Sequence, residues 1–321
     1  MKKSLLALAV LGAFASAASA QSTVTLSGRL DAGVIRSSNQ WSLGGSQSGY
    51  NAFTISGTED LGGGMRAFFL MNHRFVIGTG VNNAGANAAN ANQFWRNAWV
   101  GLGGGFGDVR LGRMLTPLQE VNGGYDAFDT GTVGSVHVNG LFNVANVRAN
   151  NTIYYRTPNL GGLFAHASIS AGEGQIATGG GVNTLATAFP NSERPIGMAV
   201  GYAAGPLSVA VAFDKNATDR TTKAIYGKYN FGFMTLMGQY ENGETSATAD
   251  TTGISVSAVV PFGAGRLMAG VARIDPSVGV TLTKVGLGGE YNLSRRTLLY
   301  TDFGKVKNAK AMFDLGVRHS F

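Results

Sequence analysis

Cysteine is absent from the 321-residue sequence, and this absence excludes disulfide bridges and thiolate metal sites. Charged residues make up only 13% of the chain, whereas an ordinary soluble domain has about 25%. After residue 20 no stretch approaches the roughly 20 apolar residues that a membrane-spanning helix needs. Long basic runs are also missing, so we expect no nucleic-acid partner. The fold must depend on backbone hydrogen bonds and packing.

Signatures of catalysis and of cofactor binding are missing as well. The sequence has neither a His-Glu-x-x-His motif nor a Gly-x-Ser-x-Gly motif, and its four histidines are scattered at His73, His137, His166 and His319. The glycine cluster at residues 103–107 is better interpreted as a turn than as a phosphate cradle, because no helix follows it. We therefore expect a protein that is not an enzyme and that uses no cofactor or metal.

The N-terminus has the three parts of a secretory signal peptide. Met1-Lys2-Lys3 is basic, Leu5 to Ala15 is apolar, and Ala18-Ser19-Ala20 has the small residues of a cleavage site. The sequence therefore predicts a signal peptide over residues 1–20 and a mature domain over residues 21–321. Removal of the two N-terminal lysines would lower the formal charge from +7 to +5.

Apolar and polar residues alternate along segments of about ten residues, the length with which a tilted strand spans a bilayer. This alternation occurs over residues 24–34, 207–213 and 254–260. It occurs again at the C-terminus, where one face carries Phe313, Leu315, Val317, His319 and Phe321 and the other carries Asp314, Gly316, Arg318 and Ser320. Such strands suit a wall that has lipid on one side and water on the other.

The turns between these strands give the strand number. Short turns rich in Gly, Pro or Asn lie at residues 59–64, 103–108, 158–162, 203–206, 230–233, 261–265 and 292–296. Longer polar segments lie near residues 37–50, 76–92, 115–147, 173–194, 214–222, 242–251, 275–280 and 304–309. Together they predict an all-β fold, a 16-stranded antiparallel transmembrane β-barrel. A barrel of this size has a water-filled lumen, and its closure leaves no unpaired strand edge in lipid.

Several motifs follow one another along the mature chain. They are Gly57-Thr-Glu-Asp-Leu-Gly-Gly-Gly64, Ala98-Trp-Val-Gly-Leu102, Leu111-Gly-Arg113, Asn150 to Pro158, Leu293-Ser-Arg-Arg-Thr297 and the terminal Phe321. In this order they resemble the general porins of Gram-negative outer membranes, in particular those of beta-proteobacteria. The resemblance implies an outer-membrane homotrimer whose third long loop folds into the pore of each barrel. It also implies that Phe321 ends a signal that the outer-membrane assembly machinery recognises.

The resemblance further implies a pore constriction where the third loop meets the wall. In porins of this family an acidic inner loop faces a cluster of wall arginines, and the resulting field favours one sign of ion. Arg113 and Arg148 match family positions in that cluster. The loop would contribute the carboxylates of Glu120, Asp126 and Asp129, although the two aspartates could simply keep the loop soluble.

Strand alternation bears on both arginines. If Ile153 faces lipid, Arg148 faces water on the same strand. Strict alternation from Val109 and Leu111 would instead turn Arg113 toward lipid, so a lumen-facing Arg113 requires an irregularity at Gly112.

One position departs from the family pattern. Such porins often have an arginine where this chain has Ala52, which would make the constriction less positive. Arg29, Arg66 and Arg74 share a lumen-facing parity and could compensate for it, although any of these arginines could instead be an ordinary solvated wall residue. Anion preference is therefore a hypothesis at this point.

The sequence thus predicts a passive channel for small hydrophilic solutes and ions. A substrate-specific channel of the same architecture is one alternative, and its conductance would be blocked by one class of solute at low concentration. An exported β-sandwich that binds a ligand is another, because it would show the same alternation of residues. Such a protein would be soluble without detergent.

Overall fold

The structure is a computed structural model, and it describes residues 22–44, 51–82, 94–129, 131–137, 148–171 and 194–321. The predicted signal peptide lies outside these residues and stays a prediction. Among the described residues, no helix is long and apolar enough to cross a membrane.

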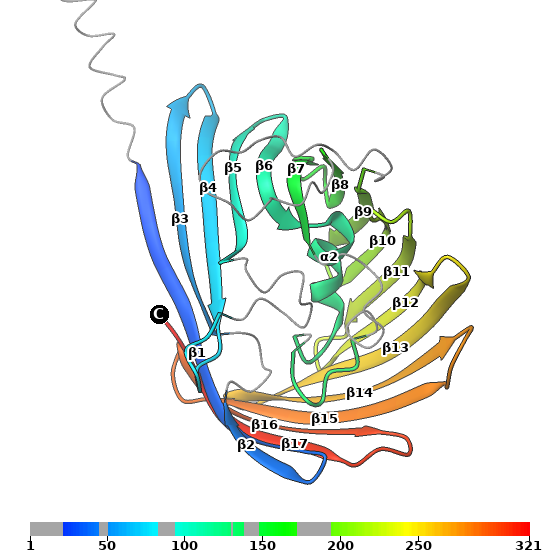
Figure 1. The fold of residues 1–321 in the computed structure, drawn as a ribbon. Coiled ribbons are helices and arrows are strands. Elements are labelled where there is room, and N and C mark those ends of the chain that lie inside the picture. The colour runs from blue at the N-terminus through cyan, green and yellow to red at the C-terminus, as the bar shows by residue number, and fades with distance from the viewer. Residues whose placement is uncertain (1–21, 45–50, 83–93, 130, 138–147, 172–193) are drawn as a thin grey trace, which may run out of the picture.

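The described chain consists almost entirely of antiparallel strands (Figure 1). The strands of the first half are β1 (Thr23–Ser37), β2 (Gln40–Gly44), β3 (Asn51–Gly62), β4 (Met65–Phe75), β5 (Trp95–Gly104), β6 (Gly107–Leu115), β7 (Arg148–Arg156) and β8 (Leu163–Ser170). Those of the second half are β9 (Ile196–Ala204), β10 (Leu207–Lys215), β11 (Thr221–Asn230), β12 (Thr235–Ser246), β13 (Ala249–Phe262), β14 (Gly265–Pro276), β15 (Leu282–Asn292), β16 (Thr297–Val306) and β17 (Met312–Ser320).

The seventeen segments form a barrel of sixteen strands, because β2 and β3 lie end to end along the same edge of β1. At the junction of β2 and β3, the side chain of Asn51 pairs with the backbone of β1. Its Oδ1 atom accepts from the Asp31 amide at 2.6 Å, and its Nδ2 atom donates to the Asp31 carbonyl at 3.1 Å. These bonds satisfy backbone groups that would otherwise lack a partner where the strand is interrupted.

The alternation of apolar and polar residues along the strands gives the barrel wall an outer and an inner face. Val211 of β10 lies opposite Ile225 of β11, and both point outward with more than half of their surface exposed, at 53% and 58%. The next pair, Ala210 and Tyr226, points inward and is buried. This period of two is the pattern of a barrel wall in lipid, and it excludes the β-sandwich alternative, because one sheet closes on itself.

Closure occurs between β1 and β17, where Arg29 to Arg36 pair with Ser320 to Phe313. The last residue extends this pairing, since Phe321 and Gly28 exchange two backbone hydrogen bonds of 3.0 Å each. The ring of Phe321 covers Gly28 on the outer face, so the Cβ atom of any other residue at position 28 would overlap the ring. Gly28 is therefore a socket for the terminal aromatic residue.

All seven predicted short turns lie between strands, but the described parts of two predicted loops are largely strand. The segment near residues 37–50 begins with a tight turn at Ser38 and Asn39, whose positive φ values of 52° and 65° suit a hairpin, and continues as β2. The segment 242–251 is a hairpin in which β12 and β13 pair as far as Ser246 and Ala249. The two segments were predicted as loops because they are polar. That prediction was wrong for their strand residues, because the parts of strands that extend beyond the lipid need no apolar face.

The third long connection follows β6 and turns inward. It contains helix α2 (Pro117–Asn122) and the 3₁₀-helix η2 (Gly123–Tyr125). Figure 1 shows α2 inside the ring of strands, and α2 contacts β8, β9 and β10. The predicted inward-folded third loop is therefore confirmed.

Replacing Gly28 by valine tests the socket for Phe321. We expect Gly28→Val to lower the free energy of unfolding by about 1 to 3 kcal/mol, because the new side chain must displace the terminal ring. Thermal unfolding in detergent, followed by circular dichroism, measures the effect. The matched control is Gly227→Val on the outer face of β11, where a Cβ atom meets open space. Equal stability of the two variants would contradict the socket.

Candidate functional site

Helix α2 begins at a cap that is anchored to the wall. Thr116 is the N-cap residue, and its hydroxyl accepts from the Gln119 amide at 3.4 Å. Pro117 occupies the first turn, where its missing N–H costs nothing. The hydroxyl of Thr116 also donates to the buried carboxylate of Asp214 on β10. The start of the helix is thus fixed to the barrel as well as capped.

The end of α2 is anchored in the same way by a second wall carboxylate. Asn122 donates to Oε1 of Glu241 on β12 at 3.1 Å, and Tyr226 of β11 donates to the same oxygen at 2.7 Å. In η2, the carbonyl of Tyr125 accepts from Gln239 at 2.7 Å. Burial raises the pKa of Tyr125, an effect that its hydrogen bond to a serine partly offsets. Both ends of the helix are therefore hydrogen-bonded to buried wall side chains.

Between these anchors, α2 lies on a patch of small wall residues. Leu118 is fully buried and Val121 nearly so. They pack against Tyr226 and against four alanines of β9, β10 and β11, namely Ala199, Ala210, Ala212 and Ala224. Alanine at these positions leaves space in which a helix can approach the wall closely. The apolar surface that the helix buries here stabilises its position in the lumen.

Further along, the loop lies on a row of three glycines. Gly270 of β14, Gly286 of β15 and Gly304 of β16 are directly opposite one another in the sheet register. A Cβ atom at Gly286 would overlap the carbonyl of Gly134, and one at Gly304 would overlap the carbonyl of Val133. At Gly270 it would lie 2.6 Å from Val136. The missing side chains therefore form a shallow track across the wall that receives residues 133–136.

Asp126 belongs to the internal structure of this part of the loop. Its carboxylate accepts from Ser135 at 2.7 Å and from the Phe128 amide at 3.4 Å, and the residue is only 3% exposed. Burial lowers the pKa of the nearby His137, although the Asp126 carboxylate opposes this shift. Asp126 thus stabilises the loop, and it presents almost none of its charge to water.

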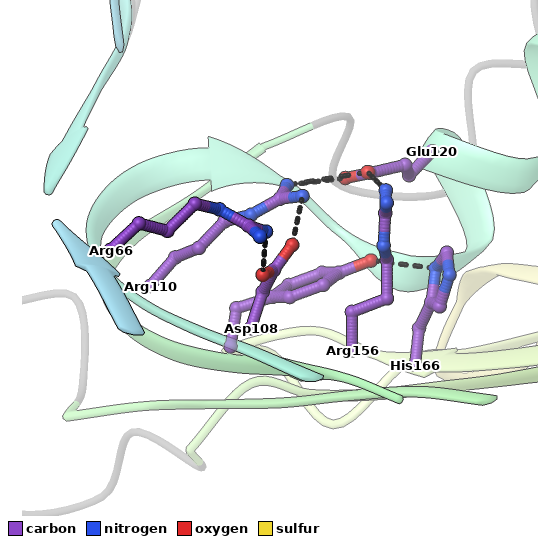
Figure 2. Close-up of polar contacts among 7 residues, drawn as sticks. Arg66, Asp108, Arg110, Glu120, Arg156 and His166 are labelled. Atoms are coloured by element: carbon purple, nitrogen blue, oxygen red, sulfur yellow. Dashed lines mark hydrogen bonds and ion pairs between the residues drawn. The ribbon is translucent and has the colours of Figure 1, made fainter. Parts of the chain in front are cut away.

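Glu120 of α2 joins a cluster of charged wall residues, the first arginine cluster, formed by Arg66, Asp108, Arg110, Glu120 and Arg156 (Figure 2). Asp108 pairs with Arg66 and lies 3.9 Å from Arg110. Glu120 lies 3.3 Å from Arg110 and 3.8 Å from Arg156. Three arginines against two carboxylates give a formal charge of +1. The side chains of Arg66 and Arg156 remain 45% and 43% exposed, so part of this charge is open to water.

Beside this cluster, a histidine completes the polar inner face. His166 of β8, which is labelled in Figure 2, shares a 2.8 Å hydrogen bond with the buried Tyr154 of β7. The ring of Tyr154 also lies under the Arg110 guanidinium, 5.5 Å from its centroid. The Tyr154 ring thus contacts the flat face of the Arg110 guanidinium, while Asp108 and Glu120 contact its edge. Together these contacts fix the position of Arg110.

Asp129 joins a second arginine cluster, formed by Arg29, Asp31, Asp129, Arg266, Glu290 and Arg318. Arg266 lies 2.7 Å from Asp129 and 2.8 Å from Glu290, and Arg318 lies 3.8 Å from Glu290. Arg29 interacts electrostatically with Arg318 and with the three carboxylates of this group. Three arginines and three carboxylates give a formal charge of zero. The loop therefore contacts an arginine cluster at Glu120 and another at Asp129.

The structure contains the irregularity that Arg113 requires. Gly112 has a φ of 140°, and the register of β6 against β7 shifts between Gly112 and Met114. The Arg113 guanidinium donates to the side chain of Asn150 on β7. Arg148 is buried and donates to Asn97 of β5 at 2.8 Å. Both arginines thus donate hydrogen bonds to amide side chains of the wall.

Ala52 lies directly between two of the predicted arginines. It is opposite Arg29 of β1 on one side and opposite Arg74 of β4 on the other. Residues opposite each other in a sheet point to the same face, so all three positions face the lumen. The row therefore has an arginine on each side of a small residue. Arg66 lies at the start of β4, away from this row, and it belongs to the first cluster.

Seven residues of the clusters were not among the predicted site residues. They are Asp31, Asp108, Arg110, Arg156, Arg266, Glu290 and Arg318. Alternation places each of them on the polar face of its strand, and this signal could have found them. Nothing in the sequence indicates that these residues belong together, because their partners lie on other strands or in the loop.

The inner face as a whole carries charged groups that can select ions. Within the described parts of the chain, no group of three or more His, Asp or Glu side chains could hold a metal ion. A closed barrel with a loop fixed inside it and arginine-rich charged clusters on its inner wall defines a membrane channel of the β-barrel class.

Comparisons with known proteins place the chain within that class. The family described as Gram-negative porin matches residues 7–311. Outer membrane porin protein 32 of Delftia acidovorans is 34% identical over 97% of this chain and 91% of its own length. The chain belongs to the Gram-negative porin family, and it is an outer-membrane porin that forms a diffusion channel.

Solved structures agree with this assignment. The anion-selective porin from Comamonas acidovorans superposes with a TM-score of 0.79 at 29% identity, over 94% of this chain and all of its own. The trimer form of OmpT from Vibrio cholerae shares the fold with a TM-score of 0.70 at 15% identity, over 94% of this chain and 99% of its own.

The glycine row yields a test of loop position. We expect Gly286→Ala to lower the single-channel conductance, because the added Cβ atom forces residues 133–136 away from the wall and into the lumen. Recordings in planar bilayers measure the change. Gly289→Ala is the matched control, since Gly289 lies on the same strand and a Cβ atom there makes ordinary contacts at 3.5 Å. Unchanged conductance in Gly286→Ala would show that the loop does not depend on the track.

Proposed function

We propose that this porin is a general diffusion channel that prefers anions. The observation that supports it is the excess of arginines over carboxylates in the first cluster, which has a formal charge of +1 and keeps Arg66 and Arg156 exposed to water. A positive potential in a narrow aqueous pore raises the local concentration of anions. A related porin of known structure, from Comamonas acidovorans, is described as anion-selective.

The third loop sets the size limit in this proposal. The loop is held at a fixed depth in the lumen by its hydrogen bonds to Asp214 and Glu241 and by its packing on the glycine row. Solutes pass beside the loop, near Arg113 and Arg148 and past the two arginine clusters. Of the three loop carboxylates, Glu120 and Asp129 act on the arginines directly, and Asp126 acts by shaping the loop.

Assembly and export remain part of the proposal. The protein forms a homotrimer, residues 1–20 are removed as a signal peptide, and the strand that ends at Phe321 is recognised during assembly in the outer membrane. The trimer form of OmpT supports the first point, because it shows that a barrel of this fold can assemble in threes. Outer-membrane lipids contact the apolar outer face.

Single-channel recording of the purified protein tests the function. Ohmic steps that arrive in groups of three are expected, with a reversal potential across a KCl gradient that indicates preference for chloride. A clear preference for potassium would reject the anion hypothesis. Block by one class of solute at low concentration would instead favour a substrate-specific channel of the same architecture.

Position 52 offers a gain-of-function test. We expect Ala52→Arg to raise the chloride-to-potassium permeability ratio on the order of twofold or more, because it adds a lumen-facing charge between Arg29 and Arg74. The reversal potential in a KCl gradient gives the ratio. Ala52→Gln is the control for side-chain length, and it should leave the ratio unchanged. An equal change in both variants would assign the effect to pore size rather than charge.

A further inference from the structure

The two arginine clusters are built on the same plan. In the first, Asp108 contacts both Arg66 and Arg110. In the second, Glu290 contacts both Arg266 and Arg318. Each carboxylate lies on a barrel strand, β6 or β15, and each therefore links two wall arginines independently of the loop.

Each of these two wall carboxylates is much less exposed than one of the two arginines that it pairs with. The side chains of Asp108 and Glu290 are 10% and 8% exposed, against 45% for Arg66 and 29% for Arg266. The water in the pore therefore meets Arg66 and Arg266 more directly than it meets their carboxylate partners. The buried carboxylate reduces the positive potential without presenting a binding site for cations.

Local features of the wall are adapted to these pairs. Asp108 lies opposite Gly103 in the sheet, and a Cβ atom at Gly103 would come within 2.8 Å of the Arg66 guanidinium. Glycine at this position leaves space for the ion pair to form across the strands. Glu290 lies directly opposite Arg266, and its two oxygens accept hydrogen bonds of 2.8 and 3.0 Å from that guanidinium.

The loop carboxylates have a different role. Glu120 and Asp129 belong to the third loop, so their ion pairs hold the loop as well as adjusting charge. Neutralising them would change loop position and charge together. Neutralising Asp108 or Glu290 changes the charge without removing an ion pair that the loop itself makes.

We propose that Asp108 and Glu290 are specificity-determining residues that limit the anion preference of the channel. This inference rests on the proposed anion preference and extends it to two residues that contact no loop carboxylate. Asp108 lowers the charge of its cluster from +2 to +1, and Glu290 lowers that of its cluster from +1 to zero, so each reduces the accumulation of anions near the wall.

Neutral variants of similar shape test the proposal. Asp108→Asn and Glu290→Gln should each raise the chloride-to-potassium permeability ratio by about two- to threefold, since each removes one negative charge beside the pore. The double variant should raise it further. Reversal potentials of the detergent-purified trimer in a KCl gradient give the ratios, and circular dichroism confirms that each variant is folded.

Two controls separate charge from structural disturbance. Asp275→Asn removes a carboxylate that pairs with Arg273 at 2.6 Å on the exposed outer face, and it should leave the ratio unchanged. The double variant Arg66→Gln with Asp108→Asn restores the cluster to +1, and it should return the ratio to the wild-type value. Failure of this variant to restore the ratio would overturn the charge mechanism.

The possible outcomes distinguish this inference from the proposed function. If the wild type prefers chloride and neither Asp108→Asn nor Glu290→Gln raises the ratio, the inference is overturned and the proposed function stands. If the wild type prefers potassium, the anion preference is overturned. A raised ratio in the variants would then still support the role of the wall carboxylates.

Discussion

In lipid, no water is available to pair with backbone amides and carbonyls, so every such group in the wall must find a partner within the protein. The barrel meets this constraint by pairing β17 with β1. Two places where regular strand pairing stops show how strictly the constraint applies. Where the first hairpin is interrupted, the side chain of Asn51 pairs with the backbone of Asp31. Where the chain ends, Phe321 and Gly28 exchange backbone bonds, and the glycine leaves space for the ring. Closure in turn creates a lumen, and the charged side chains of the two arginine clusters project into it.

Inside such a barrel there is no apolar core, so a loop placed there needs its own surface on which to pack. The wall provides two. Under α2 it presents alanines of β9 to β11, and under residues 133–136 it presents the aligned glycines of β14 to β16. Small residues leave space for the loop, while Asp214 and Glu241 fix its helix by hydrogen bonds. Flexible loops are ordinarily the least stable parts of a structure. Here buried contacts on both sides make the loop a fixed part of the pore.

The period of two and the spacing of turns were sufficient to predict the barrel, its strand number and its faces, because both follow from local chain geometry. The site was less predictable. Ion pairs such as that of Arg266 with Asp129 join residues 137 positions apart, and sequence spacing contains no record of them. Asp126 is an acidic residue of the third loop, as Glu120 and Asp129 are. Only the fold shows that its carboxylate accepts a hydrogen bond from Ser135 within the loop. The three glycines of the track lie on separate strands, and they form a row only in the register of the sheet.

A channel that attracts ions must also release them, because a solute held too strongly blocks the path of those that follow. The three arginines of each cluster would repel one another without counter-charges, and they would hold anions tightly. Carboxylates within the clusters moderate both effects. The wall pairs keep guanidinium groups in fixed positions, and they lower the field while leaving Arg66 and Arg156 in contact with water. Weak preference with rapid passage is what a general pore requires, and it follows from charges that are nearly balanced rather than from a single strong site.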